Sequence, residues 1–213
     1  MDFNFFSEQV SKIENIPLPG ESSHYKMLPG FRKKELLEER KRALSPKKAG
    51  VLALFYPDEE NKTKLLLLLR KTYQGVHSNQ IAFPGGKPEK EDVDILDTAL
   101  REAKEEVGVS VAYINVIKAL TEVYIPPSNF LVHPFFGLYQ KRGEFVKQLD
   151  EVETLIEVCL EDFLDKNTII TTQLSTSYSN ATAVPAYKLN GYVVWGATAM
   201  ILSEIKELLK QVL

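Results

Sequence analysis

Apolar residues recur along the 213-residue chain at spacings that predict alternating strands and helices. Strand-like runs cover residues 50–56, 64–70, 80–83, 109–118, 119–125, 131–140 and 151–160, and then 168–174, 183–188 and 192–195. Helical periodicity covers residues 5–15, 32–43, 94–107 and 197–212, with a short helical turn at 161–164. This succession predicts an α/β protein with a mixed sheet between helices, and we expect the last three strands to complete that sheet.

The last predicted helix carries an apolar stripe at helical spacing, formed by Ile201, Ile205, Leu208, Leu209 and Val212. Such a stripe is buried either in the core of its own domain or against a second copy of the chain. We favour the core. The dimer contact stays open, so the predicted state is a monomer or a homodimer.

The length of the chain suits one domain with elaborations. We place that domain at residues 49–213 and interpret residues 1–48 as an N-terminal helical extension packed on it. The second helix of the extension is strongly charged between Arg32 and Arg42. A charge run of this kind indicates a solvated face.

The helix predicted at 94–107 gathers acidic residues on one edge. Because each residue advances about 100° around a helix, Glu102, Glu105 and Glu106 share an arc of about 100°. An apolar stripe runs beside them, which indicates that the neighbouring edge is buried. Clustered like charges repel, and hard divalent ions such as Mg²⁺ prefer oxygen ligands. The cluster is therefore either a metal site or, as in many Glu-rich helices, a solvated surface.

Both ends of this helix carry the expected signals. Residues 83–86 read Phe-Pro-Gly-Gly, a turn that continues neither a strand nor a helix. Asp92 or Asp94 is placed to cap the N-terminus, and Gly108 stands where a left-handed C-cap residue belongs. The acids thus lie in the last two turns of a complete loop–helix–loop unit.

This unit resembles the Nudix box, whose pattern is Gly, five residues, Glu, seven residues, and Arg-Glu-aliphatic-x-Glu-Glu-x-Gly-aliphatic. Gly86 matches the first glycine, and the second half is matched by Arg101, Glu102, Ala103, Glu105, Glu106, Gly108 and Val109. Asp92 replaces the first Glu, and eight residues separate it from Arg101. The resemblance implies the Nudix fold, an α/β/α sandwich with a mixed β-sheet.

The longer spacing is similar to that of the coenzyme A pyrophosphatase branch of the family, as are the sequences at 85–92 and 98–102. An upstream signature of that branch, which begins Leu-Leu-x-x-Arg and ends Phe-Pro-Gly-Gly, is matched by Leu67, Leu68, Arg70 and residues 83–86. The interior of the signature departs from it at Lys71, Gly75 and Asn79.

The resemblance implies hydrolysis of a small-molecule nucleotide, namely coenzyme A or an acyl-coenzyme A, to 3′,5′-ADP and 4′-phosphopantetheine or its acylated form. Two alternatives stay open. One is the same chemistry on ADP-ribose or a dinucleotide, which the departures at Lys71, Gly75 and Asn79 keep open. The other is a non-catalytic nucleotide-binding module, against which the intact trio of acids argues.

The resemblance also assigns residues to roles. Mg²⁺ or Mn²⁺ is expected on Glu102, Glu105, Glu106 and the carbonyl of Gly86, with Glu105 and Glu106 as the direct catalytic ligands. Arg101 is expected to orient these acids and to pair with Glu105, four residues further on. The proton acceptor is either a box glutamate or a later acid, for which Glu151 and Glu153 are the candidates. Arg70, Lys71 and Lys87 are candidate ligands of substrate phosphates.

Composition limits which partners, metal sites and cellular locations the protein can have. The net charge of −3 gives no reason to expect binding to nucleic acid or to an anionic membrane. One cysteine, Cys159, excludes an internal disulfide and a cysteine-based zinc site. The sequence shows no signal peptide and no apolar run long enough to span a membrane. We therefore expect a cytoplasmic protein with no membrane or nucleic-acid partner.

Overall fold

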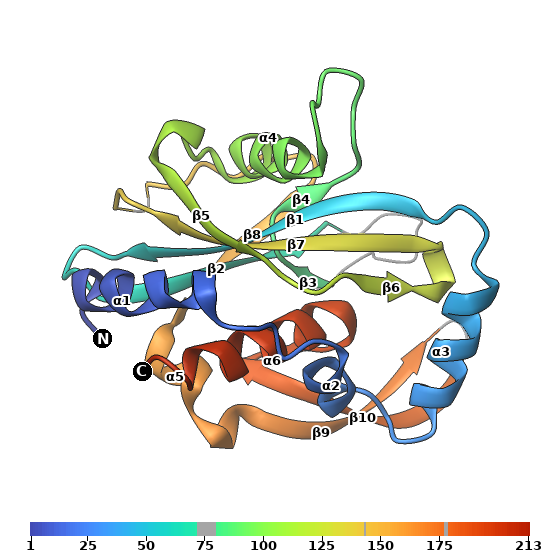
Figure 1. The fold of residues 1–213 in the computed structure, drawn as a ribbon. Coiled ribbons are helices and arrows are strands. Elements are labelled where there is room, and N and C mark those ends of the chain that lie inside the picture. The colour runs from blue at the N-terminus through green and yellow to red at the C-terminus, as the bar shows by residue number, and fades with distance from the viewer. Residues whose placement is uncertain (72–79, 143, 177–178) are drawn as a thin grey trace.

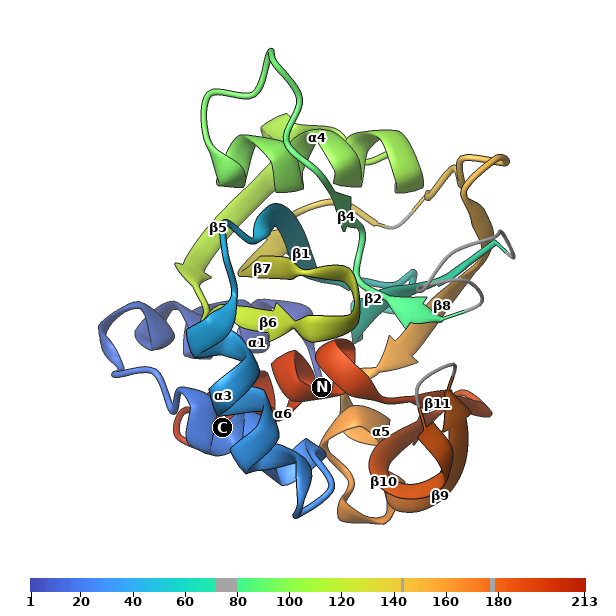
Figure 2. The same cartoon turned by 90° about the vertical axis from the view of Figure 1, so that its right-hand side faces the viewer.

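The computed structural model describes residues 1–71, 80–142, 144–176 and 179–213. Its centre is a mixed β-sheet with helices on both faces (Figures 1 and 2). Helix α4 (Ile95–Val107) covers one face, and α6 (Gly196–Leu209) lies against the other. The predicted α/β/α sandwich with a mixed sheet is confirmed.

The main sheet is built around one parallel pair of strands, β1 (Lys47–Pro57) and β7 (Phe130–Tyr139). Its path runs β3-β2-β1-β7-β5, where β2 is Thr63–Arg70, β3 is Ile81–Ala82 and β5 is Ile114–Ala119. Three further strands pair off this path: β4 (Gly85–Gly86) with β1, β6 (Val123–Ile125) with β7, and β8 (Val152–Cys159) with β2. The pairs other than β1–β7 in this sheet are antiparallel.

Strand β1 is apolar on both sides because both faces of the sheet are covered. Leu52 and Leu54 pack toward α4, in a cluster with Ala99 and Val107. The alternate residues of β1 belong to the larger core cluster on the opposite face. Successive side chains of β1 thus pack into two different cores, and the smaller core includes residues of α4, the helix that carries the acids.

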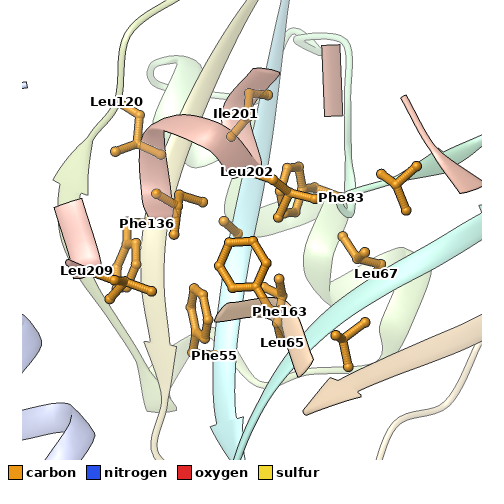
Figure 3. Packing of buried hydrophobic residues seen from close by; sticks show 14 of the residues in the cluster. Phe55, Leu65, Leu67, Phe83, Leu120, Phe136, Phe163, Ile201, Leu202 and Leu209 are labelled. Carbon is orange, nitrogen blue, oxygen red and sulfur yellow. The ribbon is translucent and has the colours of Figure 1, made fainter. Parts of the chain in front are cut away.

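The larger core lies between the sheet and α6. Figure 3 shows Phe55, Leu65 and Leu67 of the sheet pointing toward side chains of α6. The stripe residues Ile201, Ile205, Leu208 and Leu209 are all buried there, which confirms the interpretation of that stripe as core. Phe163 of α5 (Leu160–Leu164) lies in the same cluster.

The first residues of the chain also contribute to this core. Phe3, Phe6 and Val10 of α1 (Phe3–Val10), and Ile13 after it, are buried in the larger cluster. Helix α2 (Glu21–His24) is tied to α6 through the fully buried carboxylate of Glu204. Helix α3 (Arg32–Arg42) has no buried residue, as its charge run indicates.

Several expectations about strands were wrong: the strand expected at 119–125 is only β6, and Gly85–Gly86 of the expected turn form β4. The last three strands, β9 (Ile169–Thr176), β10 (Ser179–Leu189) and β11 (Tyr192–Val194), form a separate antiparallel sheet. Lys206 donates to the carbonyls of Phe163 and Asp165 at the end of α5, so α6 anchors the chain where it leaves the main sheet. The strand expected at 109–118 begins at Ile114, because residues Val111–Tyr113 form a 3₁₀ turn.

Candidate active site

Three glycines bring the backbone of the 83–86 turn against α4. Strand β4 pairs with β1 so that Gly50 lies opposite Gly86. A Cβ on Gly50 would lie 2.4 Å from the carbonyl oxygen of Ile95, and one on Gly85 would lie 2.4 Å from that of Gly50. A Cβ on Gly86 would lie 2.1 Å from Oε1 of Glu102. Because these side chains are absent, the strand, the turn and the acidic helix are in direct contact.

The ends of α4 are fixed as the sequence predicts. Asp94 is the N-cap, and its side chain accepts a hydrogen bond from the N–H of Asp97 at 2.9 Å. Gly108 is the C-cap in the left-handed conformation, with φ at +76°. A Cβ on Gly108 would also lie 3.0 Å from Val146, so this glycine lets the loop at 144–151 approach the end of the helix.

Arg101 organises the outer side of the acidic cluster. Its guanidinium donates to Glu105 at 2.9 Å and to Glu102 at 3.2 Å, which confirms the predicted pairing with Glu105. It also donates to the carbonyl of Lys87 at 2.9 Å. Arg101 therefore joins the two acids to the loop that follows Gly86.

Asp92 is a member of this site that sequence reasoning missed. Its two carboxylate oxygens accept from Nε and Nη2 of Arg101 at 2.9 and 3.1 Å, and its side chain is 3% exposed. Thr98 and the N–H of Glu89 also donate to it, at 2.9 Å each. The hydrogen bond from Arg101 holds the pKa of Asp92 below its usual range. Its place in the box, where the family pattern has Glu, was the signal.

Glu106 is buried, with 2% of its side chain exposed. The N–H of Gly85 donates to one oxygen at 2.8 Å, and Arg70 donates to the other at 3.2 Å. Burial raises the pKa of Glu106 to about 7, although Arg70 and the Gly85 N–H act in the opposite direction. This acid thus faces the turn rather than solvent.

Glu102 and Glu105 differ in exposure. The side chain of Glu102 is 14% exposed, and burial raises its pKa despite the neighbouring Arg101. The side chain of Glu105 is 53% exposed. The three acids therefore form a graded edge, from buried Glu106 to the solvent-facing Glu105.

The remaining predicted site residues lie around this edge at different distances. The second guanidinium nitrogen of Arg70 lies 3.7 Å from the carboxylate of Glu151, so Arg70 bridges Glu106 and Glu151. The N–H of Lys71 donates to the carbonyl of Glu151 at 2.9 Å. Lys87 extends over the ring of Phe130, with Nζ 5.7 Å from its centre.

Three residues that the sequence singled out have different outcomes. Glu153 is exposed on β8. Gly75 and Asn79, two of the three departures from the upstream signature, lie outside the described residues.

The donor set fits a divalent cation, although the present side-chain positions do not enclose one. Across the described ranges, no three acidic, histidine or cysteine side chains converge as metal ligands. Arg101 and Arg70 instead neutralise the acids. The available ligand atoms are carboxylate oxygens that lie close to Gly86, which has no side chain. Mg²⁺ and Mn²⁺ prefer oxygen ligands of this kind. Glu105, whose side chain is 53% exposed, is the most solvent-accessible of the three acids to such a cation.

Comparison with known proteins agrees with this geometry. The sequence model of the NUDIX domain matches residues 46–173, which is more than half of the chain. The chain belongs to the Nudix family. Within the described residues, no helix combines the length and apolar character needed to cross a membrane.

Several relatives with assigned names show similarity over part of their length. Nudix hydrolase 15, mitochondrial, from Arabidopsis thaliana is 30% identical over 162 residues, covering 74% of this chain and 56% of the relative. The peroxisomal coenzyme A diphosphatase ndx-8 of Caenorhabditis elegans is 34% identical over 118 residues, covering 55% and 50%. The chain therefore spans about half the length of these relatives.

Solved structures agree in fold. A Nudix hydrolase from M. smegmatis, RenU, superposes with a TM-score of 0.53 at 14% identity, covering 79% of this chain and 88% of that protein. The MutT protein of Methanosarcina mazei gives 0.50 at 15% identity, covering 79% and 99%.

Proposed function

We propose that the protein is a metal-dependent diphosphatase that hydrolyses coenzyme A or an acyl-coenzyme A to 3′,5′-ADP and the 4′-phosphopantetheine product. The contact of Arg70 with Glu106 at 3.2 Å carries this proposal. It joins the upstream signature of the coenzyme A branch to the catalytic box in one site. The coenzyme A diphosphatase among the relatives supports the same substrate class.

The metal ligands in this proposal are Glu102, Glu105, Glu106 and the carbonyl of Gly86. Mg²⁺ or Mn²⁺ held there would neutralise the diphosphate and acidify the attacking water. Arg101 fixes the rotamers of Glu102 and Glu105 from the outer side. The Gly85 N–H fixes Glu106 from the inner side.

Proton transfer and substrate binding are assigned to residues at the edge of the cluster. Glu151 is our candidate proton acceptor, since its carboxylate lies outside the ligand set but within reach of Arg70. Lys87 follows Gly86 directly and Lys71 follows the last residue of β2, so we assign the ammonium groups of both to contact with substrate phosphates. Arg70 is also assigned to substrate binding, because it is a cation at the same edge, where it pairs with Glu106 and Glu151.

A substrate panel tests the proposal. Coenzyme A, acyl-coenzyme A, ADP-ribose, NADH and nucleoside triphosphates are each incubated with Mg²⁺ or Mn²⁺, and the products are separated. We expect 3′,5′-ADP from the coenzyme A substrates. Preferred turnover of ADP-ribose or a dinucleotide would replace the substrate assignment while keeping the chemistry. Tight binding without turnover of any compound would identify a binding module.

The cellular location, the oligomeric state and the partners of the protein stay predictions. We propose a cytoplasmic monomer or homodimer that acts on a small-molecule nucleotide, without nucleic-acid or membrane partners. Size-exclusion chromatography with light scattering decides between the two oligomeric states.

A further inference from the structure

The loop at 144–151 links α4, which carries the acidic cluster, to Glu151, which lies outside that helix. The N–H of Val146 donates to the carbonyl of Val107 at 3.1 Å, and the N–H of Gln148 donates to that of Glu106 at 2.9 Å. These carbonyls belong to the last turn of α4, whose carbonyl groups lack partners within the helix. The loop is therefore hydrogen-bonded to the helix turn that carries Glu106.

The side chain of Gln148 organises the turn that follows. Its Oε1 accepts from the N–H of Asp150 at 2.8 Å and from the N–H of Glu151 at 2.7 Å. Its own carbonyl accepts from the N–H of Val152 at 3.0 Å. One residue thus holds the backbone on both sides of Glu151 and, through its N–H, the end of α4.

Glu151 is held from the opposite side as well. The N–H of Lys71 donates to its carbonyl at 2.9 Å, and its carboxylate lies 3.7 Å from Arg70. The N–H of Lys71 thus holds the carbonyl of Glu151, whereas Gln148 holds its N–H. Without the Gln148 acceptor, the turn at 149–151 has one anchor fewer on the loop side, and the carboxylate direction is less defined.

We propose that Gln148 is a positioning residue of the reaction, whose side-chain oxygen sets the direction in which Glu151 presents its carboxylate to the acidic cluster. This inference rests on the proposed function, and on Glu151 as the proton acceptor. Gln148 itself touches neither metal nor substrate in this scheme. Its effect passes through the backbone of Glu151.

Two substitutions separate the acceptor from the bulk of the side chain. Gln148→Met keeps the length of the side chain but removes the acceptor, whereas Gln148→Glu keeps the acceptor. We expect Gln148→Met to lower kcat about tenfold or more, by a factor no larger than that of Glu151→Gln, with KM and Mn²⁺ affinity within about twofold of wild type. Gln148→Glu is expected to stay within about threefold of wild type.

The double variant Gln148→Met/Glu151→Gln is expected to be no slower than the slower single variant, because both changes remove one function. Asp150→Asn is the matched control. It alters a neighbouring exposed side chain and keeps both N–H groups, so it should leave kcat unchanged. The proposal would be overturned if the losses of kcat in the two single variants multiplied in the double variant. It would also be overturned if Gln148→Glu and Gln148→Met lowered kcat equally.

Amide hydrogen exchange tests the same point without turnover. The N–H of Glu151 should exchange about tenfold faster in Gln148→Met and at the wild-type rate in Gln148→Glu. Unchanged exchange in Gln148→Met overturns the proposal even in an active enzyme, as does wild-type kcat in Glu151→Gln. If no compound of the substrate panel is hydrolysed, the proposed function fails, and with it the role of Gln148 in the reaction. The exchange result then shows only whether Gln148 orders the turn.

Discussion

Arg101 and Asp92 meet through two hydrogen bonds, from Nε to Oδ1 at 2.9 Å and from Nη2 to Oδ2 at 3.1 Å. Paired bonds of this kind between guanidinium and carboxylate fix orientation as well as charge. The remaining nitrogen, Nη1, is directed to Glu105. Asp92 therefore sets the orientation of the Arg101 guanidinium relative to the acids, although Asp92 lies nine residues before Arg101, in the loop.

We expect Asp92→Asn to lower kcat/KM by about tenfold to a hundredfold, because a neutral amide no longer matches the fork of Arg101. Circular dichroism should show an unchanged fold. Glu89→Gln is the matched control, since Glu89 is 62% exposed and lies 3.9 Å from the same guanidinium. Equal losses in the two variants would contradict a special role for Asp92.

The raised pKa of Glu106 predicts how the metal-free protein responds to pH. Its pKa of about 7 lies above the ordinary value of 4.5, so the folded state binds this proton more tightly than the unfolded state does. The corresponding stability is fully present below the unfolded value and is lost as pH rises through 7. Between pH 5.5 and 8 the loss is about 2 kcal/mol, or roughly 4–8 °C in Tm.

Thermal unfolding of chelator-treated protein at the two pH values measures this effect. Glu106→Gln, which cannot ionise, should show a smaller decrease in Tm than the wild type. Mn²⁺ should raise the Tm of the wild type more at pH 8 than at pH 5.5, since binding requires the ionised carboxylate. An identical pH dependence in both proteins would show that Glu106 is not the responsible group.

Glu204 is predicted to stabilise the N-terminal segment. Its carboxylate is fully buried and accepts from the N–H of Gly20 at 3.1 Å and from the N–H of Thr121 at 3.0 Å, and His24 lies 3.3 Å from it. Burial alone would raise the pKa of Glu204, but the hydrogen bonds from His24 and Thr121 outweigh it and lower the pKa. The stability it contributes is thus present above the ordinary value of 4.5 and is lost as pH falls below it.

Glu204→Gln should cost about 2 kcal/mol at pH 7, because hydrogen bonds to a charged group are replaced by weaker ones. The difference from wild type should narrow between about pH 5 and pH 3. Urea unfolding at several pH values measures it. Glu207→Gln on the same helix, whose ion pairs are partly exposed, should cost less than about 1 kcal/mol.

The sequence predicted most of the local structure around the site. Helical periodicity, an Asp cap and Gly108 defined α4, and its acids were found from their spacing alone. The pairing of Asp92 with Arg101 was not predictable in this way, because it depends on the path of the loop between them. The burial of Glu106 was also missed. A helical wheel places it beside Glu102, but the turn at Gly85 covers it.

The separate sheet of β9, β10 and β11 shows a second feature that the sequence pattern did not predict, namely which strands pair with one another. Alternating apolar residues identify strands but not their partners. Here the chain leaves the main sheet through α5, held by Lys206. That contact joins residues more than forty positions apart and leaves no local signal.

The glutamine variants of the box probe catalysis directly. Glu105→Gln and Glu106→Gln are expected to lower turnover by several orders of magnitude, because each removes the charge of a proposed metal ligand without changing its shape. Circular dichroism should confirm that both variants remain folded. Near-normal turnover in either one would mean that its assignment as a ligand is wrong.

Titration of the chelator-treated protein with Mn²⁺, followed by electron paramagnetic resonance, tests most directly whether these acids hold a divalent cation. The wild type should bind Mn²⁺, and the triple variant Glu102→Gln/Glu105→Gln/Glu106→Gln should lose that binding. Equal binding by the two proteins would contradict the account.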